Sequence, residues 1–140
     1  MWERSHSIVV PNLRADQIWN LFADINRWQE WDDSIDHASL QGEFAVGNSF
    51  ELKPKGGPKV QIELIVVEAP FRFVDKTHFP LAVMTGEHQF EETPEGLRMT
   101  TTMRVSGFLS WLWIKLVAQG IVDSLPTEMV HQAEMARERS

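Results

Sequence analysis

Residues 86–100, GEHQFEETPEGLRMT, have the pattern of a β-hairpin. The central TPEG contains the proline and glycine that are typical of turns. With TPEG as the loop, Phe90 faces Met99 on one side of the hairpin, and Glu91 faces Arg98 on the other. The first pair is apolar and the second combines opposite charges, as expected of an antiparallel sheet with one buried face and one face in solvent.

The same register assigns the neighbouring residues to the two faces. It pairs His88 with Thr101 on the inner face, and a two-residue loop at Pro80–Leu81 adds a preceding strand. The inner face then also holds Gly86, Met103, Met84, Val105, Ala82, Phe79, Thr77, Asp75, Phe73 and Phe71, and the outer face holds Thr85, Arg104, Gln89, Thr100, Arg72, Lys76 and His78. Asp75, His88 and Thr101 are polar exceptions on a face rich in phenylalanine and methionine.

The rest of the chain separates into helical and strand-like segments. A short β-branched strand over 6–10 is followed by an amphipathic pattern over 14–23 that predicts a helix. Strand patterns with turn residues between them fill 36–106, and 107–139 is helical in composition with an interruption at Pro126. No linker or internal repeat divides the sequence, so we expect one α+β domain over residues 1–140.

The amino-acid composition of the chain limits the kinds of function that we expect of it. The chain has 140 residues and a formal net charge of −7, which argues against a nucleic-acid groove or an anionic membrane surface as partner. It has no cysteine, so disulfides and thiolate nucleophiles are excluded. The N-terminus lacks the pattern of a signal peptide, and the longest apolar stretch, 108–122, is too short to span a bilayer. We therefore expect a cytoplasmic protein without a transmembrane segment.

Several short motifs, taken together and in order, resemble the START-like SRPBCC superfamily, in its polyketide cyclase/dehydrase branch. The motifs cover nearly the whole chain and consist of Trp19, the group Asp24, Trp28 and Trp31, the turn glycines Gly42 and Gly47, Val66 to Pro70, and His88 with Phe90 and Glu91. The resemblance implies a helix-grip fold, in which a curved antiparallel sheet of about seven strands wraps around a long C-terminal helix. Two short helices follow the first strand, and a cavity between sheet and helix holds an apolar small molecule in many members.

The polar residues of the inner face are the candidates for chemistry. A carboxylate such as Asp75 beside the imidazole of His88 would fix its tautomer and raise its basicity, which suits a general base that removes a proton next to a carbonyl. In the alternative that we favour, His88 only hydrogen-bonds Thr101 or a ligand. A histidine-based metal site is not expected, because His78 points outward and His131 lies on the C-terminal helix. We expect no cofactor.

A ligand held between the sheet and the C-terminal helix would contact side chains from both. The predicted ligand-binding residues are Trp31, Phe50, Phe73, Met84, His88, Phe90, Met99, Thr101, Met103, Leu116 and Met129. Aromatic and methionine side chains make such a surface apolar and adaptable.

Residues 26–36, NRWQEWDDSID, combine paired tryptophans with acids. Trp28 and Trp31 could stack a ring or gate the cavity, but packing of the short helices onto the sheet is the favoured interpretation. Of the two, we expect Trp31 to touch a ligand. The acids are Asp24, Asp32, Asp33 and Asp36. They lack the alternating ligands and central glycine of a calcium loop, so we interpret them as solvated helix caps.

The segment 108–122 is apolar nearly all round. We assign to the sheet-facing side Leu109, Leu112, Trp113, Leu116 and Gly120, and to the opposite side Trp111, Ile114, Ala118 and Val122. The opposite side then needs cover from a second subunit, a lipid surface or the chain's own loops. Leu125 precedes Pro126, which favours a kink or break there, and Leu125, Met129, Ala133 and Ala136 form an inward-facing stripe beyond it.

Three functions follow as hypotheses. The first is a module that binds a hydrophobic small molecule, lipid-like or ring-containing, between sheet and helix. The second is a cyclase/dehydrase-type enzyme on a polyketide-like substrate, with His88 as general base and Asp75 orienting it. The third, weaker, is a protein-interaction module that uses the apolar surface of 108–122, for instance in a homodimer.

Overall fold

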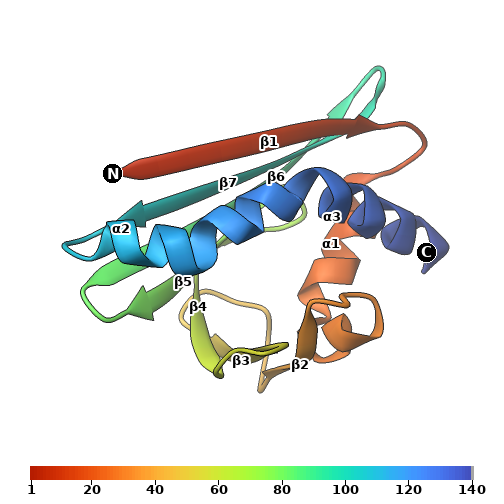
Figure 1. The fold of residues 1–140 in the computed structure, drawn as a ribbon. Coiled ribbons are helices and arrows are strands. Elements are labelled where there is room, and N and C mark those ends of the chain that lie inside the picture. The colour runs from red at the N-terminus through yellow and green to blue at the C-terminus, as the bar shows by residue number, and fades with distance from the viewer. Residues whose placement is uncertain (140) are drawn as a thin grey trace.

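The computed structural model describes residues 1–139, and Figure 1 shows their arrangement. Seven antiparallel strands form one curved sheet in the order β1-β7-β6-β5-β4-β3-β2, and a long C-terminal helix crosses it. The elements are β1 (Trp2–Val10), α1 (Ala15–Ala23), η1 (Ile25–Glu30), β2 (Ile35–Leu40), β3 (Ser49–Pro54), β4 (Val60–Glu68), β5 (Arg72–Phe79), β6 (Ala82–Thr93), β7 (Gly96–Ser106), α2 (Ser110–Trp113), η2 (Ile114–Ala118) and α3 (Gln119–Glu138). The predicted α+β helix-grip is confirmed, including the two short helices after β1.

The predicted hairpin register is also confirmed. Phe90 pairs with Met99 and Glu91 with Arg98, whose Nη1 lies 2.6 Å from the Glu91 carboxylate. The β5–β6 turn consists of Pro80–Leu81, since Phe79 pairs with Ala82. Phe71 is a correction: it lies in the turn before β5 and is half exposed, so it does not join the inner face.

Strand β1 is longer than its apolar core predicts. It begins at Trp2 and pairs with β7 along its whole length, up to Val10 opposite Leu97. The sequence WERS at its start has no apolar alternation, so periodicity identifies only the second half of the strand. The pairing with β7 supplies the backbone hydrogen bonds that extend it.

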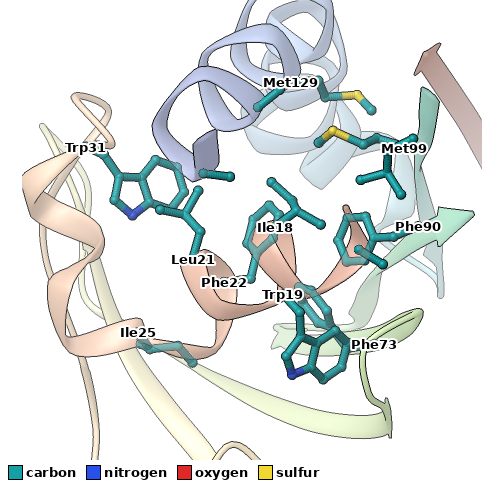
Figure 2. Close-up of a cluster of buried hydrophobic side chains, with 14 of the residues drawn as sticks. Ile18, Trp19, Leu21, Phe22, Ile25, Trp31, Phe73, Phe90, Met99 and Met129 are labelled. Carbon is teal, nitrogen blue, oxygen red and sulfur yellow. The ribbon is translucent and has the colours of Figure 1, made fainter. Parts of the chain in front are cut away.

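The core lies between the inner sheet face, α1 and the second half of α3. Ile18 and Phe22 of α1 point toward Phe90 of the sheet, and Met129 of α3 covers them from the other side (Figure 2). The predicted stripe along α3 is confirmed, because Leu125, Met129, Ala133 and Ala136 are all buried. This packing fixes the end of the helix onto α1 and β1.

Of the kink or break expected at Pro126, the break is wrong. Helix α3 runs without interruption from Gln119 to Glu138, with Pro126 inside it. Proline removes one helical hydrogen bond there, but the burial of Leu125 and Met129 on either side holds the helix together. The irregular turn lies earlier, in η2, which is a π-helix over Ile114–Ala118.

The predicted faces of the first helical turns agree with the structure at Trp111, which is exposed, and at Trp113, which stacks on Phe79. From Ile114 onward they are reversed. Leu116 was expected to face the sheet and is instead 61% exposed. Ala118 is buried, and Ile114 packs with it against Met84, Met103 and Val105 of the sheet. The physical reason is the π turn, whose hydrogen bonds span five residues and which therefore rotates the side chains relative to regular helical spacing.

Candidate functional site

His88 and Asp75 form a polar pair on the inner face of the sheet. His88 lies on β6 and Asp75 on the neighbouring strand β5, opposite Gly86. The His88 Nε2 and the Asp75 Oδ2 are 3.2 Å apart, as the sequence predicted for a carboxylate beside an imidazole. The two side chains remain 17% and 18% exposed. The pair faces inward and still keeps some solvent-exposed surface.

Aromatic rings fix the orientation of the histidine. The His88 ring stacks on Phe73, with centroids 4.4 Å apart and planes at 16°. The ring centroid of Phe22 of α1 lies 5.6 Å from the centroid of the same imidazole. Because Phe73 is fully buried, this stack leaves the imidazole little freedom to rotate away from Asp75.

A glycine makes room for the carboxylate. A Cβ atom at Gly86 would lie 3.0 Å from the Asp75 Oδ1 and 3.3 Å from the Met103 Sδ. Both contacts are tighter than ordinary van der Waals distances, so a side chain at this position would push the carboxylate aside. The absence of a side chain at Gly86 is thus part of the geometry that brings Asp75 to His88.

Two threonines complete the polar part of the inner face. Thr101 of β7 pairs with His88 in the strand register and is buried. The hydroxyl of Thr77, two residues after Asp75, is buried and has no hydrogen-bond partner among residues 1–139. Buried hydroxyls are nearly always hydrogen-bonded in folded proteins. Sequence patterns could place Thr77 on this face but could not show that its hydroxyl lacks a partner.

Most of the predicted ligand-binding residues are brought together, in two apolar clusters. The first lies against α1 and α3 and contains Trp31, Phe50, Phe73, Phe90, Met99 and Met129. The second, under η2, contains Met84 and Met103. His88 lies between Met84 and Phe90 along β6, so the polar pair separates the two clusters. Leu116 points away from both.

The paired tryptophans pack the corner of the fold. Trp28 contacts Phe50 with ring centroids 5.3 Å apart, and its Nε1 donates to the carbonyl oxygen of Phe22 at 3.0 Å. Trp31 is buried, and its carbonyl oxygen accepts a 2.6 Å hydrogen bond from His131 of α3. These contacts support packing as the role of the pair. Asp32, one of the acids after them, accepts hydrogen bonds from Ser34.

Two cavities lie away from the polar pair. One, of about 370 Å³, is open to solvent and bordered by α1, η1 and the end of α3, and its lining includes Arg14, Gln17, Arg27, Trp31 and Arg139. The other is an open surface depression of about 520 Å³, lined by the β4–β5 turn and by residues 89–92 of β6. Charged and polar side chains contribute heavily to both. Trp31 thus touches a cavity, but one on the outside of the corner.

The outer sheet face carries an ion-pair network that the sequence analysis missed. Glu87 accepts hydrogen bonds from Arg72 at 2.6 Å and from Arg104 at 3.0 Å, and these arginines pair with Glu68 and Glu3. Burial raises the pKa of Glu87, but the two arginines outweigh burial and leave its pKa below the usual value. The alternation of β5, β6 and β7, which puts these residues on one face, is the signal that could have revealed it.

Two further features concern metals and membranes. Within residues 1–139, no three histidine or acidic side chains are grouped so that they could hold a metal ion. None of the helices in this part of the chain has the length and apolar character that a membrane crossing requires.

Comparison with known proteins identifies the family. A sequence model of the family described as polyketide cyclase / dehydrase and lipid transport matches residues 1–131. The chain belongs to this family. The resemblance of its motifs to the START-like SRPBCC superfamily is thereby confirmed. No curated protein has a sequence close enough to match.

Solved structures share the fold at low sequence identity. A hypothetical protein of Helicobacter pylori has a TM-score of 0.79 at 12% identity, covering 96% of this chain and 87% of its own. Norcoclaurine synthase from Thalictrum flavum, in complex with dopamine and hydroxybenzaldehyde, has a TM-score of 0.75 at 12% identity, covering 99% and 88%. The di-domain ARO/CYC StfQ from the steffimycin biosynthetic pathway has 0.75 at 16%, covering 98% and 51%, so this chain spans about half of its length. At such identities the similarity shows the fold alone.

Proposed function

We propose that this protein binds a hydrophobic small molecule against the inner sheet face beneath the C-terminal helix, with a polar group of the ligand at the His88–Asp75 pair. The observation that carries the proposal is this pair itself. Its two members face inward, lie 3.2 Å apart and keep some exposed surface between two apolar clusters. A surface of this kind matches a ligand with an apolar skeleton and one polar end.

The free-energy cost of placing His88 and Asp75 on the inner face supports a role for them beyond packing. Placing a carboxylate and an imidazole on an otherwise apolar face carries a desolvation penalty that a hydrophobic pair would avoid. The orphan hydroxyl of Thr77 adds a further polar group on the same sheet face, two residues along β5 from Asp75. The fold neighbour norcoclaurine synthase was solved with two aromatic ligands, which supports a ring-containing ligand here.

Native mass spectrometry of the protein as purified tests the binding directly. We expect a fraction of molecules to carry a noncovalent adduct, and a hydrophobic fluorescent probe, 8-anilinonaphthalene-1-sulfonate, to bind with a defined stoichiometry. His88→Ala should weaken probe binding about tenfold, the equivalent of one lost polar contact of about 1.4 kcal/mol. His78→Ala is the matched control, because His78 is exposed at the end of β5. Equal affinities of the two variants would contradict the proposal.

A second candidate function is catalysis of the cyclase/dehydrase type, and the geometry of the same pair favours it. When the His88 Nε2–H donates to the Asp75 Oδ2, Nδ1 keeps its lone pair and can accept a proton from a carbon next to a carbonyl. The resulting carbanion closes a ring by attacking a second carbonyl, and the imidazolium returns the proton to the oxygen. Asp75 acts here as a positioning residue that stabilises the imidazolium.

The two functions differ in what His88→Ala removes. For an enzyme, turnover falls by about two to four orders of magnitude while ligand affinity changes little. For a binding protein, affinity falls and there is no turnover to lose. Measuring both quantities on the same preparation, with His78→Ala alongside, separates the two functions.

A further inference from the structure

The end of the molecule where β7 meets α2 exposes large apolar side chains. The exposed fractions are 84% for Phe108, 64% for Trp111, 64% for Leu81 and 61% for Leu116. We call these four residues the apical patch. The β5–β6 turn, which carries Leu81, and the β7–α2 connection lie at the same end of the sheet (Figure 1). Monomeric soluble proteins seldom gather such side chains in solvent without a partner.

Close backbone contacts hold the two segments of the apical patch together. The amide of Leu109 donates to the carbonyl oxygen of Leu81 at 2.9 Å. A Cβ atom at Gly107 would lie 2.7 Å from that same oxygen, so only glycine permits this approach. Trp113 then stacks on Phe79 at 4.4 Å and donates from Nε1 to the carbonyl oxygen of Pro80. The exposed side chains therefore project from a rigid base.

The conformation of Leu81 also sets this end apart. Leu81 is the second residue of a two-residue turn and has φ of +58°. Glycine and asparagine adopt such angles readily, whereas a branched side chain does so at a cost in free energy. The turn thus combines an unfavourable backbone conformation with a large exposed apolar side chain, and a partner that buries this side chain would offset both.

Charge indicates the kind of partner. The segments 76–86 and 104–122, which carry the apical patch, contain no aspartate or glutamate, although the chain has 20 acidic residues. The adjoining strand β1 brings one carboxylate to the same end, that of Glu3, which is paired with Arg104 at 2.6 Å. Lys115 is exposed on η2, next to Leu116. The four side chains of the apical patch could therefore enter an apolar medium without a carboxylate from their own segments, and Lys115 could reach the phosphate groups of lipids at the edge. The rest of the chain carries the negative charge and would stay in water.

We propose that the apical patch docks the protein onto a phospholipid bilayer surface, with Phe108, Trp111, Leu81 and Leu116 inserted at the level of the headgroups. Tryptophan and phenylalanine are favoured at that depth. A second copy of the chain fits less well, because the segments that carry the apical patch would offer the Lys115 of a facing copy no carboxylate. This inference goes beyond the proposed ligand binding and does not depend on it.

Flotation of the full chain with vesicles of pure phosphatidylcholine tests the docking. We expect the wild-type protein to float with the vesicles, and Trp111→Asp and Phe108→Asp each to lower the partition coefficient about tenfold or more. Both side chains are exposed, so the fold should be retained, which circular dichroism checks. Phe71→Asp is the matched control, since it replaces a half-exposed phenylalanine outside the apical patch and should leave flotation unchanged.

Other outcomes would overturn the docking proposal. The proposal is wrong if the wild-type protein does not float with the vesicles. It is also wrong if Phe71→Asp and Trp111→Asp lower the partition coefficient equally. Light scattering supplies an independent check. A dimer in solution that Trp111→Asp dissociates, without vesicle binding, would assign the apical patch to a second copy instead.

Discussion

His88 and Asp75 combine two properties that inward-facing residues rarely share, because they are polar partners of each other and remain partly accessible. Both could be predicted from the sequence, since a strand alternates its side chains with a period of two and the hairpin turns fix the register. The stacking on Phe73 and the orphan hydroxyl of Thr77 could not, because they depend on side-chain packing across strands.

Gly86→Ala tests the geometry of the pair at single-residue resolution. The added methyl group would lie 3.0 Å from the Asp75 carboxylate, so it should displace the carboxylate and destabilise the protein by about 1–3 kcal/mol. Urea denaturation measures this change. Gly120→Ala is the control, because nothing lies within 4 Å of its added Cβ, and it should stabilise helix α3 by about 0.5–1 kcal/mol. If neither substitution lowers the free energy of unfolding, Gly86 plays no part in positioning Asp75.

The C-terminal helix illustrates what spacing predicts and what it does not. Its inward stripe from Leu125 to Ala136 follows the regular helical period and was predicted correctly. The assignment of Leu116 to the buried face was wrong, because the π turn of η2 changes the period and no residue in the sequence marks it. As a result Leu116 is exposed, as Trp111 is.

Pro126→Ala tests the continuity of this helix. Proline at an exposed position within α3 leaves one carbonyl without its helical partner, so alanine should raise the free energy of unfolding by about 1–2 kcal/mol. Thr127→Ala, at the next exposed position, should change it by less than about 0.7 kcal/mol. Thermal or urea denaturation compares the two. A loss of stability in Pro126→Ala would indicate that the proline supports a bend that the fold needs.

The outer sheet face contributes an electrostatic element to stability. The pKa of Glu87 is below its usual value in the folded state, so its stabilising effect is present above the ordinary glutamate pKa of about 4.3 and is lost as the pH falls through the folded value. Glu87→Gln should cost about 1 kcal/mol at pH 7, a modest figure because Arg72 and Arg104 are about one-third exposed. The difference in free energy of unfolding between Glu87→Gln and the wild type should disappear at a pH below the folded-state pKa of Glu87.

The matched control for that substitution is Glu91→Gln. Glu91 lies on β6, as Glu87 does, and forms an exposed ion pair with Arg98 of β7. Its effect should stay within about 0.5 kcal/mol at every pH. If Glu87→Gln and Glu91→Gln follow the same pH profile in urea denaturation, the network around Glu87 adds nothing beyond a surface pair.

At the scale of the whole molecule, the sheet and the C-terminal helix divide the surface into three regions of different chemistry. The inner face carries the polar pair between apolar clusters, the outer face carries ion pairs, and one end carries the apical patch. The motifs of the sequence predicted the fold and the first region. They did not predict the positions of the cavities near α1 and β6, because cavities arise where side chains from distant segments fail to fill space.

The central claim is that a hydrophobic ligand binds on the inner face beside His88. Methionine-methyl NMR during titration with 8-anilinonaphthalene-1-sulfonate tests it most directly, because the six methionines sample different regions. We predict that the methyl signals of Met84 and Met103, which flank the polar pair, shift with saturation, while exposed Met1 does not respond. A response confined to Met135, which precedes the cavity-lining residue Ala136 in α3, would contradict the claim and place the ligand outside the grip.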